Sequence, residues 1–167
     1  MITCKKELER IKKECASMVT KRASLSAGAA VVPIPGVDVG SDIALLVEMI
    51  PAINKKFGLT PEQIEQMDAE TKIMVMGVIS NIGSQMAGKT ITKQLVMNIL
   101  KKMGIRVASK NVVKYIPLIG QVISGTISFG GMKYIGNSHI NDCYKIVGQL
   151  IEKNEEQKDE GEAFAVG

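Results

Sequence analysis

The sequence predicts an all-α fold, a compact multi-helix domain built from two Pro-x-x-Gly helical hairpins plus connecting helices. Apolar residues recur at helical spacing through most of the 167 residues, and no segment requires a β-strand. Aromatic residues make up only 4% of the chain, so small and aliphatic side chains must fill the core. Small residues let helices approach closely. Because the chain is long enough for one sizeable core, we expect a single domain over residues 1–153.

The first helix is expected to run from Thr3, its N-cap, to about Val32. Apolar residues between Leu8 and Val19 recur on one face, and charged residues cover the other. The helix then meets the sequence Pro33-Ile34-Pro35-Gly36. Proline fixes φ and lacks an amide hydrogen, and glycine reaches backbone conformations that other residues avoid. We therefore expect this element to form a corner between two packed helices.

Capping residues predict where the next helices begin. Asp38 is expected to cap a second helix, which Pro51 either kinks or ends. Thr60 and Gln63 match a capping box and predict the start of a short helix. Asp68 is expected to cap the strongly apolar helix that follows.

Two further helices are expected before a second corner. Lys89 should open an amphipathic helix that ends at Gly104, and Ile105–Tyr115 should form a shorter, basic one. In the next residues, Pro117 and Gly120 repeat the Pro-x-x-Gly spacing of the first corner. This repeat predicts two matched helical hairpins.

The rest of the chain is expected to form one long helix, or two nearly collinear ones, over Leu118–Ile151. Residues 154–167 are polar and acidic, and we expect them to be a disordered tail.

Positive charge is concentrated between residues 89 and 114, where seven lysine and arginine residues occur without any acidic residue. They are Lys89, Lys93, Lys101, Lys102, Arg106, Lys110 and Lys114. We expect this run to bind an anionic membrane surface or an acidic protein partner, and a merely solvated face is the alternative. Nucleic acid is disfavoured, because Tyr115 is the only aromatic residue close by.

The segment Gly83–Thr90 matches the pattern G-x-x-x-x-G-K-[ST] of phosphate-binding loops. In such a loop Lys89 would neutralise phosphate and Thr90 would reach Mg²⁺. The preceding residues Ile73–Ile79 could be the required strand. No alternating βαβ pattern follows, however, so a break between two helices is the favoured interpretation. Nucleotide binding is kept as a second alternative function.

His139, Asp142 and Cys143 have the i, i+3, i+4 spacing that places side chains on one helical face. Such neighbours are needed by a thiolate nucleophile or a metal site. One histidine and one cysteine are too few ligands, and no oxyanion site is visible. We therefore expect a structural role, and we predict no catalytic residue, metal or cofactor.

Cysteine usage and hydropathy predict a cytoplasmic protein, with membrane association left open. The three cysteines are an odd number without metal-finger spacing, which favours a reducing compartment. The uncharged stretches 23–37, 73–88 and 115–132 approach, but do not reach, the about 20 apolar residues that span a bilayer. Buried core helices are the favoured interpretation. Membrane insertion, by an effector or pore-former, is the alternative.

Short motifs add a family resemblance that covers roughly residues 20–150. Pro33-x-Pro35-Gly36-Val37-Asp38, followed by Asp42-Ile43-Ala44-Leu45-Leu46, resembles a segment in the helical domain of immunity-related (interferon-inducible) GTPases and of related bacterial GTPases. Tyr115–Gly120, followed by Ser128-Phe129, resembles the later Pro-x-x-Gly element of that domain. The resemblance implies a helical domain that packs next to a G domain, self-associates or contacts membranes. Nucleotide hydrolysis in that family belongs to the separate G domain, for which this chain has no room.

Together these observations predict a non-enzymatic helical interaction module. It would bind a protein partner, itself or an anionic membrane surface.

Overall fold

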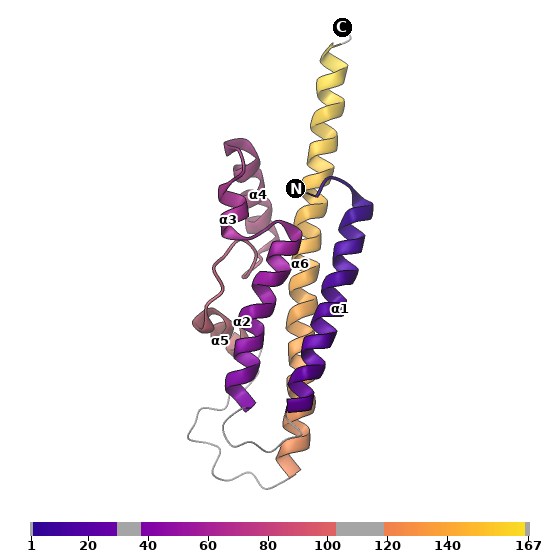
Figure 1. The fold of residues 1–167 in the computed structure, drawn as a ribbon. Helices are drawn as coiled ribbons and strands as arrows, with labels where there is room; N and C mark the ends of the chain where they lie inside the picture. The colour runs from indigo at the N-terminus through magenta and orange to yellow at the C-terminus, as the bar shows by residue number, and fades with distance from the viewer. Residues whose placement is uncertain (1, 30–37, 103–118, 166–167) are drawn as a thin grey trace. The chain divides into compact units, whose positions relative to one another are not determined.

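The computed structural model describes residues 2–29, 38–102 and 119–165 of the chain (Figure 1). All regular secondary structure in these ranges is α-helical, which confirms the predicted all-α fold. The helices within these described ranges are α1 (Lys5–Ala29), α2 (Asp38–Phe57), α3 (Pro61–Glu65), α4 (Ala69–Ile82), α5 (Lys93–Lys102) and α6 (Ile119–Ala165).

Contacts between residues divide the chain into two compact units. Unit 1 comprises Met1–Cys15, Ile53–Thr90 and His139–Gly167. Unit 2 comprises Ala16–Ala52 and Ile91–Ser138.

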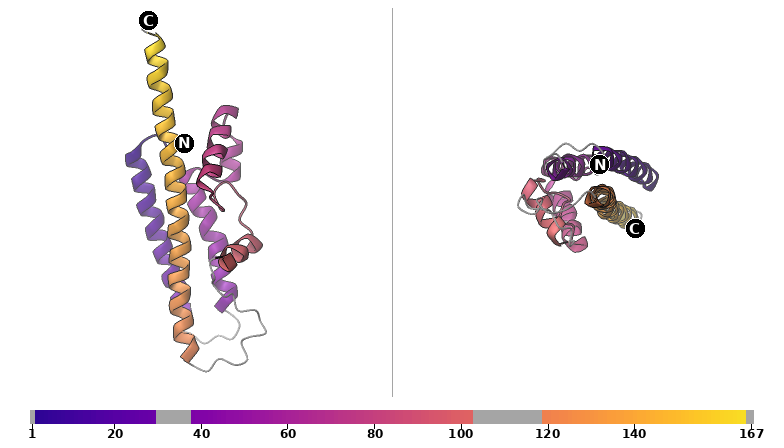
Figure 2. Two further views of the ribbon diagram at one scale, coloured as in Figure 1. Left: turned by 180° about the vertical axis from the view of Figure 1, so that it is seen from behind. Right: turned by 90° about the horizontal axis from the view of Figure 1, so that it is seen from below.

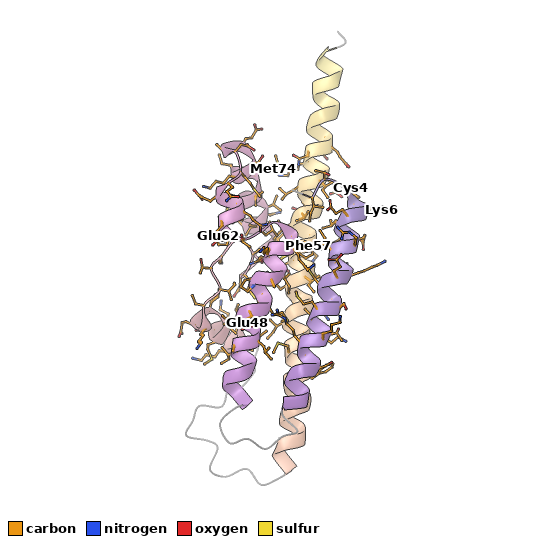
Figure 3. The ribbon with its side chains drawn as sticks, in the orientation of Figure 1. Cys4, Lys6, Glu48, Phe57, Glu62 and Met74 are labelled. Atoms are coloured by element: carbon orange, nitrogen blue, oxygen red, sulfur yellow. The ribbon has the colours of Figure 1, made fainter. Side chains whose placement is uncertain are left out.

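In unit 1, the N-terminal part of α1 lies beside the C-terminal part of α6 (Figure 2). Two surface contacts join these segments: Lys5 forms an ion pair with Glu152, and the Tyr144 hydroxyl donates a hydrogen bond to Glu9. The apolar part of the core beneath is aliphatic except for Phe57, which is labelled in Figure 3. Its largest fully buried apolar side chains are Phe57, Leu8, Ile53, Leu59, Ile146, Leu150 and Val75.

Local capping signals position α3 and α4 in unit 1 as predicted. The hydroxyl of Thr60 accepts from the amide of Gln63, and the Gln63 side chain accepts from the amide of Thr60, which completes the capping box. The carboxylate of Asp68 accepts from the amide of Thr71 at 2.9 Å. Gly83 then ends α4 in the left-handed conformation, with φ of 72°.

In unit 2, a glycine allows three helices to approach one another closely. A Cβ atom on Gly136 of α6 would lie 2.7 Å from both γ carbons of Val19 on α1, and 3.1 Å from Cε of Met49 on α2. Three helices therefore meet where only a hydrogen atom fits. This contact agrees with the prediction that small residues allow close packing.

Several helix boundaries differ from the predicted ones. Helix α1 begins at Lys5, and the Cys4 carbonyl accepts its first hydrogen bond from Leu8, so Thr3 is not the N-cap. Pro51 lies inside α2 and does not end it. Helix α5 begins at Lys93, not at Lys89, because the hydroxyl of Thr92 accepts from the amide of residue 95 and caps it.

Helix α6 is the predicted long C-terminal helix in its continuous form. It includes residues 154–165, where the sequence predicted a disordered tail. Glutamate, lysine, glutamine and alanine are good helix formers, so this segment extends a helix that packing has already nucleated.

The two predicted corners are only partly within the described residues. Pro33, Pro35, Gly36 and Pro117 lie outside them, as does the predicted basic helix Ile105–Tyr115. Gly120 is the second residue of α6. The pairing of the two Pro-x-x-Gly elements stays a prediction.

Candidate functional site

The predicted basic run is described in part. Lys93, Lys101 and Lys102 are exposed on α5 in unit 2, and Lys89 is exposed in the connection that precedes it, in unit 1. Arg106, Lys110 and Lys114 lie outside the described residues.

Helix α5 is strongly amphipathic. Its apolar side chains Val96, Ile99 and Leu100 are buried. The opposite side carries the three lysines with Gln94 and Asn98, whose side chains bond to each other at 3.2 Å. Helix α5 therefore presents cationic and neutral polar groups to solvent.

The helix dipole accounts for some of these lysines but not for others. Cations are stabilising near a helix C-terminus, where Lys101 and Lys102 lie, and unfavourable at its N-terminus. Lys93 is the first residue of α5. Its position is therefore not explained by the stability of the helix.

The Gly83–Thr90 segment lacks the setting of a phosphate-binding loop. The residues before it, Ile73–Ile79, belong to helix α4, so the strand interpretation of the sequence was wrong. No helix begins at Lys89 or Thr90 either. The segment is a break between two helices, as the favoured interpretation predicted.

Several backbone amides of this segment are also occupied. The amide of Gly83 donates to Ile79 and Ser80 carbonyls, and that of Gly88 donates to the Leu59 carbonyl at 3.0 Å. The amide of Ala87 donates to the Ser84 hydroxyl at 3.3 Å. A phosphate-binding loop needs these donors for its ligand. Gly83 and Gly88 both have positive φ, a conformation that glycine adopts readily, so the backbone of the fold explains why glycine occurs at these positions.

A buried polar cluster, which we call the Asn54 cluster, links α2, α6 and the Gly83–Thr90 segment within unit 1. It consists of Asn54, His139 and Cys143. The Asn54 amide nitrogen donates to the Met86 carbonyl at 3.0 Å, and its oxygen lies 2.8 Å from Nε2 of His139. All three members of the cluster are buried.

The Met86 carbonyl determines the protonation of the cluster. Since that carbonyl can only accept, the Asn54 nitrogen must face it and the Asn54 oxygen must face His139. Nε2 of His139 therefore carries the hydrogen and donates it. Nδ1 is the unprotonated nitrogen, and the Sγ atom of Cys143 is 3.9 Å from it.

Burial keeps the cluster neutral. It lowers the pKa of His139 to about 4 and raises the pKa of Cys143 well above its usual value. A buried, protonated thiol is not a nucleophile. The cluster therefore has the properties of a structural hydrogen-bond network, as the sequence predicted for His139 and Cys143.

Asp142 does not join its predicted neighbours. It is half-buried and bonds to the hydroxyl of Ser84, and burial raises the pKa of its carboxyl. Asn54 was missed by sequence reasoning, because 85 residues separate it from His139. Its signal in the sequence was weak, because Asn54 stands between the apolar run 49–53 and Lys55.

Neither a metal centre nor a membrane span is found among the described residues. No group of three or more histidine, cysteine or acidic side chains there could hold a metal ion. None of the helices, as far as they are described, has the length and hydropathy needed to cross a bilayer.

Comparisons with protein-family models, curated proteins and solved structures found no match to this chain. The resemblance to the helical domain of immunity-related GTPases therefore stays a prediction.

Proposed function

We propose that the chain is a non-enzymatic interaction module that docks on an anionic membrane surface through the exposed lysines of α5. The observation that carries this proposal is the combination of an acid-free basic run with a helix whose apolar side is already buried. Such a helix offers charge to a partner with little apolar area, since only Leu95 and Met97 are partly exposed among its apolar residues. It would lie against headgroups and not insert.

The chemistry of the α5 surface favours lipid phosphates over a protein partner. Protein interfaces concentrate their binding energy in tryptophan, tyrosine and arginine. The described part of α5 has none of these, and its exposed residues are lysines and neutral amides. Lysine is a hydrated point charge that suits a diffuse layer of phosphates, and each one near an anionic bilayer contributes about 1 kcal/mol.

Vesicle flotation tests the proposal. The protein is expected to float with phosphatidylcholine vesicles that contain phosphatidylserine, and to remain unbound when phosphatidylserine is omitted. Binding should weaken strongly when salt is raised from about 0.05 to about 0.5 M, because the surface potential is screened. The double variant Lys93→Gln/Lys101→Gln should bind about 30-fold more weakly, since two lysine contributions are lost.

A matched control removes the same charge elsewhere. Lys6 and Lys13 are exposed on α1, outside the basic run, and Lys6→Gln/Lys13→Gln should retain vesicle binding. Equal loss in both double variants would contradict a role for α5 and indicate a response to net charge alone. Release of an entrapped dye would instead support the membrane-inserting alternative.

A further inference from the structure

We propose that the Asn54 cluster is an acid-sensitive latch, in which protonation of His139 opens unit 1 and releases the Gly83–Thr90 segment. The inference concerns unit 1 alone and does not depend on lipid binding by α5. It is carried by the hydrogen bonds of the cluster and by the lack of any place for a second proton.

Asn54 couples the histidine to the segment. Its side chain bonds to the Met86 carbonyl and to His139 at the same time. Its backbone carbonyl accepts from the Leu59 amide at 2.8 Å, and the Leu59 carbonyl accepts from Gly88. A displacement of Asn54 therefore disturbs the segment through both its side chain and its backbone.

The neutral cluster satisfies its hydrogen bonds, whereas the protonated one does not. A proton added to Nδ1 of His139 would need an acceptor, and the polar atom near it is the Sγ atom of Cys143, 3.9 Å away. Sulfur is a weak acceptor. An imidazolium would therefore be a buried cation with one adequate acceptor, the Asn54 oxygen.

The elements around the cluster supply no compensating charge. Burial raises the pKa of Cys143, and the carboxyl of Asp142 on α6 and the thiol of Cys15 on α1 raise it further. The Asp142 carboxyl also bonds to Ser84 of the segment. On α2 the nearby cation is Lys56, which is exposed and paired with Glu14 of α1. None of these groups contributes to the pKa of His139, which burial alone lowers.

Release of the segment would expose apolar surface. Met86 and Ala87 are buried, and Gly88 lies against the side chains of Ile64 and Ile79. Residues 73–88 contain no charged side chain at all. An acidic environment would thus uncover an uncharged stretch that is covered in part at neutral pH.

The direction in which pH changes the stability of the closed state follows from the lowered pKa of His139. Since the unfolded histidine takes up its proton near pH 6.5 and the folded one near 4, the contribution of the latch is complete above 6.5 and is lost as the pH falls toward 4. When the pH falls from about 7 to about 5, the equilibrium constant for closing unit 1 should decrease about 20-fold.

Amide hydrogen exchange measures the opening directly. The amide of Gly88 donates to the Leu59 carbonyl, which lies outside the segment, so its protection factor should fall about 20-fold between these two pH values when the segment is released. In His139→Gln, a side-chain amide replaces the donor to Asn54 and cannot titrate. Protection in this variant should not change over the same range.

Two further measurements keep the test decisive. Asp68→Asn removes a carboxylate from unit 1 and should retain the full pH response of the natural sequence. His139 is the only histidine, so its imidazole proton resonances report its titration in the unmodified protein even if His139→Gln fails to fold. An imidazole that titrates near 6.5 without loss of protection would overturn the proposal, as would an unchanged pH response in His139→Gln.

Discussion

Gly136 lies so close to Val19 that a Cβ atom on it would be 2.7 Å from both γ carbons of the valine. Val19 is fully buried and branched at Cβ, so it has little freedom to move away. We expect Gly136→Ala to lower the free energy of unfolding of unit 2 by about 1–3 kcal/mol through overpacking, which urea denaturation would measure.

Gly130→Ala is the matched control for that substitution. Gly130 lies in the same unit on the same helix, and no atom would lie within 4 Å of its Cβ. This variant should gain about 0.5–1 kcal/mol, because alanine favours helix. Equal effects of the two substitutions would show that the Val19 contact is not tight in solution.

Asn54→Ala should lower the stability of unit 1 by about 2–4 kcal/mol, since the Met86 carbonyl and the His139 donor both lose their partner in a buried site. Thermal and urea unfolding would measure the loss. Asn81→Ala is the comparison, because Asn81 is exposed in the same unit. Its effect should stay within about 0.5 kcal/mol.

The three cysteines should react with a thiol reagent in two classes. Cys4, labelled at the start of α1 in Figure 3, is exposed and should react at once. Cys15 and Cys143 are buried, and burial raises the pKa of Cys15 to about 11. They should react only at the rate at which unit 1 opens. Three fast thiols at pH 7 would contradict this burial.

The same raised pKa values predict a loss of stability in alkali. The unfolded thiols ionise near pH 9 and the folded ones at higher pH, so stability is unaffected below 9. It should decline as the pH rises from 9 toward 11, and Cys15→Ser/Cys143→Ala should show a smaller decline. Denaturation by urea at a series of pH values would measure it.

Gly88→Ala should destabilise unit 1 more than Gly83→Ala does. Both positions have positive φ, which costs alanine about 1 kcal/mol. At Gly88 a Cβ would also lie 3.1 Å from the δ carbons of Ile64 and Ile79, whereas space is open at Gly83. A larger loss at Gly83 would mean that the segment packs differently.

Lys89→Ala tests the nucleotide alternative separately. Lys89 is exposed, and the amides of Gly83, Ala87 and Gly88, which a phosphate would need, are bonded within the protein. We expect no shift of the melting temperature on addition of ATP or GTP with Mg²⁺, in either the natural sequence or the variant. A shift that Lys89→Ala abolishes would restore the phosphate-loop interpretation.

Local signals in the sequence predicted the parts of the fold that are decided locally. The capping box at Thr60 and the cap at Asp68 involve atoms three residues apart, so their hydrogen bonds can be inferred from residue type and spacing. The start of α5 was misplaced because Lys89 and Lys93 are both good helix formers, and the hydroxyl of Thr92 selects between them.

Contacts between residues that are far apart in the chain could not be predicted from the sequence. Asn54 meets Met86 and His139 only after α2, α6 and the intervening segment have packed. The interhelical contact at Gly136 was likewise predicted in kind, as small-residue packing, but its partners Val19 and Met49 were not. Helical periodicity shows which face is buried and does not show what it is buried against.

The position of Asn54 in a helix also affects how readily its side chain loses the amide nitrogen by deamidation. Loss of the amide nitrogen requires attack by the backbone amide of Lys55, which the helical geometry of α2 prevents. An unfolded chain has no such protection. Once the side chain has become a carboxylate, it can no longer donate to the Met86 carbonyl, so a chain left unfolded for long should refold into a permanently weakened unit 1.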